Sequence, residues 1–276
     1  MKILVADPAK NITVFVLDPV ESPDERAALA RAIMAEKSLG AEQVGFVVSP
    51  ENSARGTGYG SEKSLWHLEM AGGEFCGNAA RSFGLYAARQ QGFKGRTKVF
   101  VSMSGVTGPV AVEVDTEKHW AAAEMPKPLA VEPLDYEGLP LTALVFEGIT
   151  HVIAPDFEAK SETFYAVKSL AEREIRGMFP AAVGVMFYDT AAGFLRPAVY
   201  VRCTDTMVFE ASCGSGSAAL GIWLSRGLFD GSALYAIPQK GGVIETEVVK
   251  KAGEIVRITI GGEVILGEPR KFPWEF

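Results

Sequence analysis

The chain has 276 residues, and its 27 Lys and Arg against 34 Asp and Glu give a formal net charge of −7 with the three histidines neutral. Its 48% hydrophobic and 22% charged residues suffice for a substantial core, which excludes disordered, collagen-like and disulfide-stapled miniature proteins. An isoelectric point near 5.2 without a basic stripe argues against nucleic acid or an anionic membrane as the main partner. A small-molecule enzyme is therefore the leading class.

Short runs of β-branched and aromatic residues, bounded by Gly, Pro, Asp or Asn, predict that strands dominate the structure. These expected strands are residues 12–17, 44–48, 99–101, 110–114, 143–146, 183–188, 198–201, 243–248, 256–260 and 264–266. A first helix is predicted to begin after Ser22, an N-cap residue followed by proline and then by a capping-box glutamate, and to extend to about Glu36. Further helices follow Cys76, run from near Ser161 to a C-cap at Gly177, and follow Cys213 as far as Gly227.

The chain matches itself when it is shifted by about half its length. A shift of 137 residues (213 − 76) superposes both Cys-Gly dipeptides, and a shift of 139 (183 − 44) superposes two predicted strands. The matched pairs are Cys76-Gly77 with Cys213-Gly214, Gly84 with Gly221, Asp24 with Ser161, and 44–46 with 183–185. Since the order of strand, helix, strand and Cys-Gly-helix agrees, the sequence predicts an internal duplication.

The duplication predicts two αβ domains. The first comprises residues 1–120 together with a C-terminal tail of about 265–276, and the second comprises residues 121–264. The proline-rich stretch 125–133 is the natural linker. We expect the tail to return to the first half.

The chain has three cysteines, Cys76, Cys203 and Cys213, without the spacing or the adjacent histidine pair of a metal site. The first seven residues are too short for a signal peptide, and no run approaches the roughly 20 apolar residues of a membrane span. We therefore expect a reduced, cytoplasmic protein without a metal site and without a membrane partner. Cys203 has no counterpart in the first half and is expected to be structural.

Cys76 and Cys213 each stand where a helix of small residues begins. Unpaired N–H groups and a macrodipole of roughly +0.5 charge favour anions at such a position. The pKa of each thiol, ordinarily about 8.5, is therefore expected to fall. A substrate carboxylate is expected to bind the same N–H groups.

If the two halves face each other, the two thiols are predicted to flank one α-carbon. One thiolate then removes the α-proton while the opposite thiol supplies a proton to the other face. The alternative for each cysteine is a packed core thiol, which their repeat-related positions disfavour. Neither half has a Cys-His-Asn arrangement or a Gly-x-Ser-x-Gly elbow, as a hydrolase would need.

These motifs resemble the diaminopimelate epimerase family, cofactor-independent amino-acid racemases and epimerases with Cys-Gly-Asn in one half and Cys-Gly-Ser/Thr-Gly in the other. The matching features, which cover essentially the whole chain, are Asn11, Gly45, residues 73–78, His151, residues 213–216 and Gly241-Gly242. The resemblance implies an α+β fold of two pseudo-symmetric domains, each a mostly antiparallel sheet curled around a central helix, with the active site in the cleft between them. It also implies that no cofactor is needed, and no lysine or glycine-rich loop suggests one.

Within this family, the chain looks similar to the histidine racemases that feed opine-type metallophore synthesis, through residues 42–46, 74–79 and 212–216. Two departures weaken diaminopimelate as the substrate. The family's Gly-Asn-Pro-His is replaced by residues 148–151, and its Glu-Arg pair before the second cysteine is reduced to Glu210. The resemblance therefore implies a histidine racemase, with diaminopimelate epimerase as the alternative, and a homodimer. A non-catalytic binding protein or a phenazine-type isomerase of the same fold would not need both cysteines.

Site residues follow from the same resemblance. Backbone N–H groups of Gly77, Asn78, Gly214 and Ser215 are expected to bind the α-carboxylate, with the side chains of Asn11 and Asn78 orienting it.

Three further side chains are candidates for substrate contact. Glu42 resembles the residue that meets the substrate side chain, where a carboxylate suits an imidazole N–H or an ammonium; otherwise it is a solvated loop residue. Glu210 binds the substrate ammonium or forms a structural ion pair. His151 contacts the substrate or polarises a thiol, unless it is structural.

Overall fold

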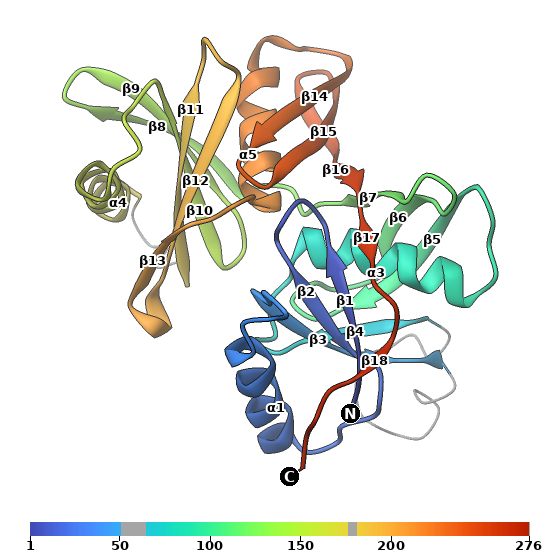
Figure 1. Ribbon diagram of the computed structural model, residues 1–276. Helices are drawn as coiled ribbons and strands as arrows, with labels where there is room; N and C mark the ends of the chain where they lie inside the picture. The colour runs from blue at the N-terminus through green and yellow to red at the C-terminus, as the bar shows by residue number, and fades with distance from the viewer. Residues whose placement is uncertain (51–64, 176–180, 276) are drawn as a thin grey trace. The chain divides into compact units, whose positions relative to one another are not determined.

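The computed structural model describes residues 1–50, 65–175 and 181–275, a mixed α+β fold dominated by strands (Figure 1). The chain forms two compact units: unit 1 comprises Met1–Glu124 and Gly261–Phe276, and unit 2 comprises Met125–Ile260. The predicted boundaries lie at residues 120 and 265. None of the described helices is long and apolar enough to cross a membrane.

The sheet of unit 1 brings both ends of the chain together. Its strands follow the order β7 (Trp120–Glu124), β6 (Val110–Asp115), β5 (Arg96–Met103), β4 (His67–Met70), β3 (Gln43–Val48), β2 (Thr13–Val16), β1 (Lys2–Asp7) and β17 (Ile265–Leu266), and β18 (Arg270–Lys271) also pairs with β1. Most of these pairs are antiparallel, whereas β2 with β3 and β4 with β5 are parallel. Leu266 pairs with Ala6 and Lys271 with Lys2, so the C-terminal tail is part of unit 1.

Helix α1 (Pro23–Ala35) confirms the capping signal. The Ser22 hydroxyl accepts a hydrogen bond from the Glu25 N–H at 3.4 Å, Pro23 takes the first helical position, and Glu36 is the C-cap. Its buried face, which includes Leu29 and Ile33, packs in a cluster with residues of β1, β2 and β3.

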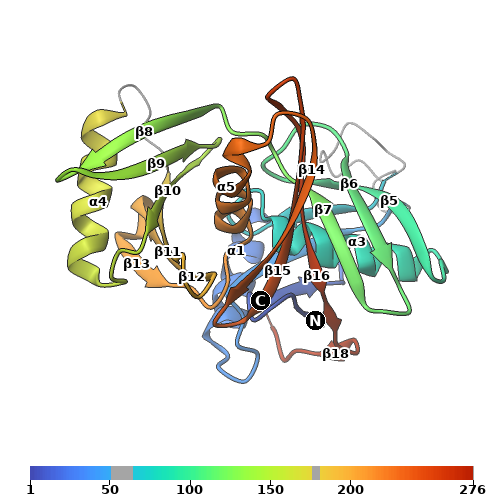
Figure 2. The same cartoon turned by 90° about the horizontal axis from the view of Figure 1, so that it is seen from above.

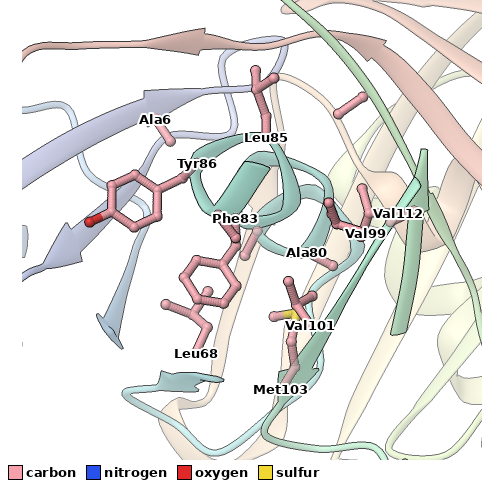
Figure 3. Close-up of a cluster of buried hydrophobic side chains, with 14 of the residues drawn as sticks. Ala6, Leu68, Ala80, Phe83, Leu85, Tyr86, Val99, Val101, Met103 and Val112 are labelled. Atoms are coloured by element: carbon pink, nitrogen blue, oxygen red, sulfur yellow. The ribbon is translucent and has the colours of Figure 1, made fainter. Parts of the chain in front are cut away.

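Helix α3 (Gly77–Gln90) is the centre of unit 1. Every residue from Gly77 to Ala88 is buried, which requires protein on all sides of the helix. Figure 3 shows Phe83 beside Leu68 of β4, and Val112 of β6 against the helix. A Cβ at Gly84 would lie only 2.5–2.8 Å from the side chain of Val112, so this glycine lets the helix touch the sheet.

Unit 2 contains two groups of strands. A six-stranded sheet has the order β13 (Thr206–Phe209), β12 (Phe194–Val201), β11 (Ala182–Asp189), β10 (Ile149–Pro155), β9 (Leu139–Val145) and β8 (Ala130–Tyr136). The second group is β14 (Gly231–Gln239), β15 (Gly242–Lys251) and β16 (Glu254–Glu263), and short 3-10 turns are η1 (Arg202–Thr204) and η2 (Ser225–Gly227). In the six-stranded sheet, β10 pairs with β11 in parallel, whereas β8 with β9, β9 with β10, β11 with β12 and β12 with β13 are antiparallel.

Helices α4 (Ser161–Glu174) and α5 (Gly214–Leu224) cover opposite faces of that sheet (Figure 2). Helix α4 buries Phe164 and Val167 against it. It ends at Glu174, earlier than predicted, and Gly177 lies outside the described residues. Helix α5 packs on β15, where a Cβ at Gly221 would run into the methyl group of Thr246.

The predicted linker is wrong in its second half. Residues 125–129 connect the units, but β8 begins at Ala130 and includes Pro133, which is paired with Thr142 of β9. Because β8 is an edge strand, a proline without an N–H is tolerated there. The predicted strands also missed β1, β7, β10, β13, β14 and β18, and Cys203 lies in the turn η1.

Candidate active site

Cys76 is the N-cap residue of α3, with extended backbone angles of φ −124° and ψ 116°. Its sulfur accepts a hydrogen bond from the Ala79 N–H at 3.4 Å. The side-chain amide of Gln43, at the start of β3, also hydrogen-bonds this sulfur. Gly77 and Asn78 form the first turn, where backbone N–H groups face the end of the helix.

The expected low pKa at this position is wrong. Burial raises the pKa of the Cys76 thiol to about 11, and the neighbouring Glu74 carboxylate adds to the rise. Donation from Ala79, Gln43 and the Asn78 backbone lowers the pKa by less. Loss of hydration therefore outweighs the helix terminus, and the thiol is protonated at neutral pH.

Three predicted site residues of unit 1 are linked by side-chain hydrogen bonds. The Asn11 amide donates to the Glu42 carboxylate at 2.6 Å, and the Asn78 amide donates to the Asn11 carbonyl oxygen at 3.1 Å. Asn11 and Asn78 are only 5% and 1% exposed. Burial raises the pKa of Glu42, while donation from Asn11 opposes the rise. Glu42 is therefore an exposed loop residue whose carboxylate is fixed by the buried Asn11 and Asn78 side chains.

Cys213 is the N-cap residue of α5, with φ −130° and ψ 116°, close to the backbone angles of Cys76. Its N–H donates to the side-chain oxygen of Gln239 at 2.9 Å, and the Gln239 amide donates to the Ser217 hydroxyl at 2.8 Å. That hydroxyl donates to the Cys213 carbonyl at 2.7 Å. The N–H and the carbonyl group of Cys213 are thus both hydrogen-bonded, which fixes the start of α5.

The Cys213 sulfur is buried between polar neighbours and one glycine. The Ser215 hydroxyl lies 3.7 Å away, and the thiol donates a hydrogen bond to the Glu210 carboxylate. Burial and the charge of Glu210 raise the pKa of this thiol well above its ordinary value. A Cβ at Gly216 would lie 3.2 Å from the sulfur and would overlap Met186, so a larger residue does not fit there.

His151 lies on β10 and is completely buried. Its Nε2 is 2.9 Å from the Ser215 hydroxyl, and its Nδ1 has no hydrogen-bond partner within the described chain. Burial lowers the pKa of His151 to about 3, so the ring is neutral. His151 thus contacts Ser215, whose hydroxyl lies next to the sulfur of Cys213.

The other histidines have ordinary structural surroundings. His67 is buried in β4 between Ser102 and Glu69, and His119 is an exposed turn residue beside Arg89. Within residues 1–50, 65–175 and 181–275, no group of three or more His, Cys, Asp or Glu side chains is placed to hold a metal ion.

Four polar residues in these networks were not predicted: Gln43, Arg81, Ser217 and Gln239. Arg81 is fully buried in α3, and its Nε donates to the Asn78 side-chain oxygen at 3.1 Å. A charged residue inside a helix of Gly, Ala, Ser and Phe was a usable signal for Arg81. The two glutamines are single residues at strand ends, and the sequence pattern does not distinguish them.

The fold is that of racemase- and epimerase-type isomerases. A predicted epimerase from Pseudomonas aeruginosa is similar over 99% of both chains, with a TM-score of 0.63 at 9% identity. A probable proline racemase from Agrobacterium radiobacter K84, solved with bound carbonate, has a TM-score of 0.62 at 11% identity over 99% of this chain and 93% of its own.

Sequence similarity defines the family more closely. The family model "Histidine racemase CntK N-terminal domain" matches residues 1–268. A histidine racemase of Fusobacterium nucleatum (strain ATCC 23726) is 34% identical over 226 residues, which cover 80% of each chain. The chain belongs to this histidine racemase family, and it is an isomerase of the amino-acid racemase and epimerase kind.

Proposed function

We propose that the chain is a cofactor-independent histidine racemase that inverts the α-carbon with Cys76 and Cys213 as a pair of acid and base. The observation that carries the proposal is that each unit contains one helix capped by a cysteine, at repeat-related positions and with matching backbone angles. Inversion of one centre needs a proton acceptor on one face and a donor on the other. Two equivalent thiols meet that requirement in both directions.

In the proposed step, one thiolate takes the α-proton and becomes a thiol. The electron pair of the broken C–H bond passes into the carboxylate, where the first-turn N–H groups of α3 and α5 stabilise the added negative charge. The opposite thiol then gives its proton to the other face and becomes the thiolate. Charge and protons balance, and the next turnover runs from the other side.

The thiolate has to arise when the substrate binds, because both thiols have raised pKa values beforehand. The substrate's α-ammonium brings a positive charge to the site, and a nearby positive charge lowers a thiol pKa. We propose Glu210 as the ammonium-binding group, since it already contacts the Cys213 thiol. Moving Glu210 from the thiol to the ammonium removes one cause of the high pKa of Cys213.

Glu42 supports histidine as the substrate. Its carboxylate is partly desolvated and receives a short hydrogen bond from Asn11. An imidazole N–H is a suitable donor for the remaining acceptor positions. We expect Glu42→Ala to raise KM for histidine, and an unchanged KM would reject this contact.

We also propose that the two units arose by duplication and share a diaminopimelate epimerase-like architecture. Each contains a strand, a helix and a parallel strand, β2-α1-β3 and β10-α4-β11, followed by a cysteine-capped helix. The matched glycines Gly84 and Gly221 each allow such a helix to touch a strand. The homodimer and the role in metallophore synthesis stay predictions from the resemblance, and the cytoplasmic location stays a prediction from the sequence.

The test is isotope exchange in D2O. The reduced protein is incubated separately with L-histidine, other L-amino acids and L,L-diaminopimelate, and α-deuterium is followed by NMR together with optical rotation. We expect deuterium incorporation and loss of rotation with histidine. Exchange with diaminopimelate alone would show that diaminopimelate, not histidine, is the substrate. If no amino acid exchanged its α-proton, the racemase proposal would be rejected.

A further inference from the structure

Arg81 begins a continuous chain of side-chain hydrogen bonds that ends at Glu42. Its Nε donates to Asn78 Oδ1 at 3.1 Å, Asn78 Nδ2 donates to Asn11 Oδ1 at 3.1 Å, and Asn11 Nδ2 donates to Glu42 Oε2 at 2.6 Å. The guanidinium is also anchored by Nη1, which donates to the Glu263 carbonyl at 3.1 Å. All five residues belong to unit 1.

The direction of this chain follows from Arg81. A guanidinium has only donors, so it can accept no hydrogen bond and must face the oxygen end of the Asn78 amide. The amide nitrogen of Asn78 then faces Asn11, which must present its own oxygen. The amide nitrogen of Asn11 is left for Glu42, and a donor at this point favours the ionised carboxylate.

We propose that Arg81 is a positioning residue for substrate recognition: it orients the Asn78 and Asn11 amides in one direction and thereby keeps Glu42 an ionised hydrogen-bond acceptor. This rests on the proposed function only in that Glu42 is taken as the group that meets the substrate side chain. Arg81 itself touches no substrate in this account. Its full burial within α3 keeps water from replacing the donor.

Without the guanidinium, the two amides are able to rotate together. Asn11 would then present its oxygen to Glu42, and the carboxyl group would have to be protonated to donate to it. Arg81, Asn78 and Asn11 are buried, and because hydrogen bonds between buried groups polarise one another, a change at Arg81 reaches the Asn11 amide that faces Glu42. The charge of Asp7, which is paired with Lys10, also raises the pKa of Glu42.

The experiment is a carboxyl-carbon NMR titration of glutamate-labelled protein without substrate, in which the Glu42 signal is the one missing from Glu42→Gln. We expect Arg81→Met to move the Glu42 titration midpoint upward by about one pH unit, which corresponds to a tenfold change in ionisation. Arg89→Met is the matched control, since Arg89 lies on the same helix and contacts Thr116 and His119 instead. The control should leave the midpoint unchanged.

An unchanged midpoint in folded Arg81→Met would overturn the proposal and leave Arg81 a purely structural residue. If Arg81→Met does not fold, Arg81→Lys answers the same question, because one ammonium cannot donate to both Asn78 and the Glu263 carbonyl as the guanidinium does. We expect a smaller upward shift of the Glu42 midpoint in Arg81→Lys, and an unchanged midpoint would reject the proposal.

For histidine as substrate, the Arg81 variants should raise KM more than they lower kcat. Since the titration uses no substrate, failure of histidine racemisation leaves this test intact.

Discussion

The two cysteine-capped helices have nearly the same backbone at their first residues and different polar surroundings. At Cys76, the neutral amide of Gln43 contacts the sulfur, and a separate set of hydrogen bonds joins Arg81 to Glu42. At Cys213, the carboxylate of Glu210 and the hydroxyl of Ser215 contact the sulfur itself, with neutral His151 behind the serine. The helix start places each thiol, whereas the neighbouring side chains set its chemical environment.

This difference suggests a division of work between the units. Unit 1 holds the Glu42 carboxylate at the end of a hydrogen-bond relay that runs from Arg81 through Asn78 and Asn11, and this arrangement is suited to binding a substrate side chain. Unit 2 holds a carboxylate against the thiol, which is suited to controlling the proton on sulfur. The largest expected difference between Cys76 and Cys213 is that the two thiols act on opposite enantiomers of the substrate.

Cys76→Ser and Cys213→Ser should each lower the rate of net racemisation by about 10²–10⁴-fold, because one face of the α-carbon loses its acid or base. In D2O, each variant should still exchange the α-proton of one enantiomer, and the two variants should prefer opposite ones. Optical rotation and NMR measure the two quantities separately. Undiminished racemisation by either variant would reject the two-base mechanism.

The rate of thiol alkylation reports how easily each cysteine is deprotonated, and it therefore distinguishes the surroundings of Cys76 and Cys213. Because the pKa of Cys76 is about 11 rather than 9.0, its reaction with iodoacetamide should rise about tenfold per pH unit from pH 7 to 10 without a plateau. Glu210→Gln should accelerate alkylation of Cys213 at pH 8 by roughly tenfold, since it removes the negative charge beside that sulfur. Peptide mass spectrometry measures both thiols in one sample. The rate at Cys76 is the internal control, and an equal change at both thiols would contradict the assignment.

Acid stability tests the neutral ring in unit 2. The pKa of His151 is about 3 when folded and 6.5 as the reference, so burial favours the neutral ring, and this contribution is lost as pH falls below 6.5. At pH 5, wild type should have lost about 2 kcal/mol of unfolding free energy relative to His151→Gln, at about 1.4 kcal/mol per pH unit. Urea unfolding between pH 7 and 5 measures the difference. His119→Gln, at an exposed position, should follow wild type.

The smallest expected effect concerns the glycines that bring each helix onto its sheet. Gly84→Ala and Gly221→Ala should each lower the unfolding free energy by about 1 kcal/mol, because overpacking of about 1–3 kcal/mol exceeds the helix-propensity gain. We expect the larger loss at Gly84, where the clash includes the Cβ of Val112 and not only a terminal methyl group. Val112→Ala should rescue Gly84→Ala. Additive losses in the double variant would show that the contact is loose.

Predictions from local sequence succeeded where the stabilising contacts are local. The start of α1 depends on Ser22 and its next three residues, and the first turn of α3 depends on Cys76 and the residues that follow it. Strand β1 was not predicted because its short apolar run becomes a strand through pairing with β2, β17 and β18, and β17 and β18 lie at the far end of the sequence. Strand β8 was not predicted because two prolines near its start resemble a linker, and only pairing with β9 makes it an edge strand.

The sequence predicted which residues belong to the candidate site, but not their hydrogen bonds or the pKa values of the two thiols. Asn11, Glu42 and Asn78 were each named from motif resemblance, but their mutual hydrogen bonds join two loop residues and a helix residue across 67 positions of sequence. The sequence motifs did not predict a role for Arg81, because its hydrogen-bond acceptors include the carbonyl of Glu263, which lies 182 positions away. Such partners are brought together by folding and leave no local pattern.

The amino-acid order by itself determined where the helices begin, where the cysteines stand and that the pattern occurs twice, because capping and periodicity act within about one helical turn. Tertiary structure alone decided the ionisation of the two thiols, the neutrality of His151 and the direction of the relay from Arg81 to Glu42. Proton affinity depends on how much water each group loses and on which charges and donors surround it. Those surroundings come from strands and helices that are distant along the chain.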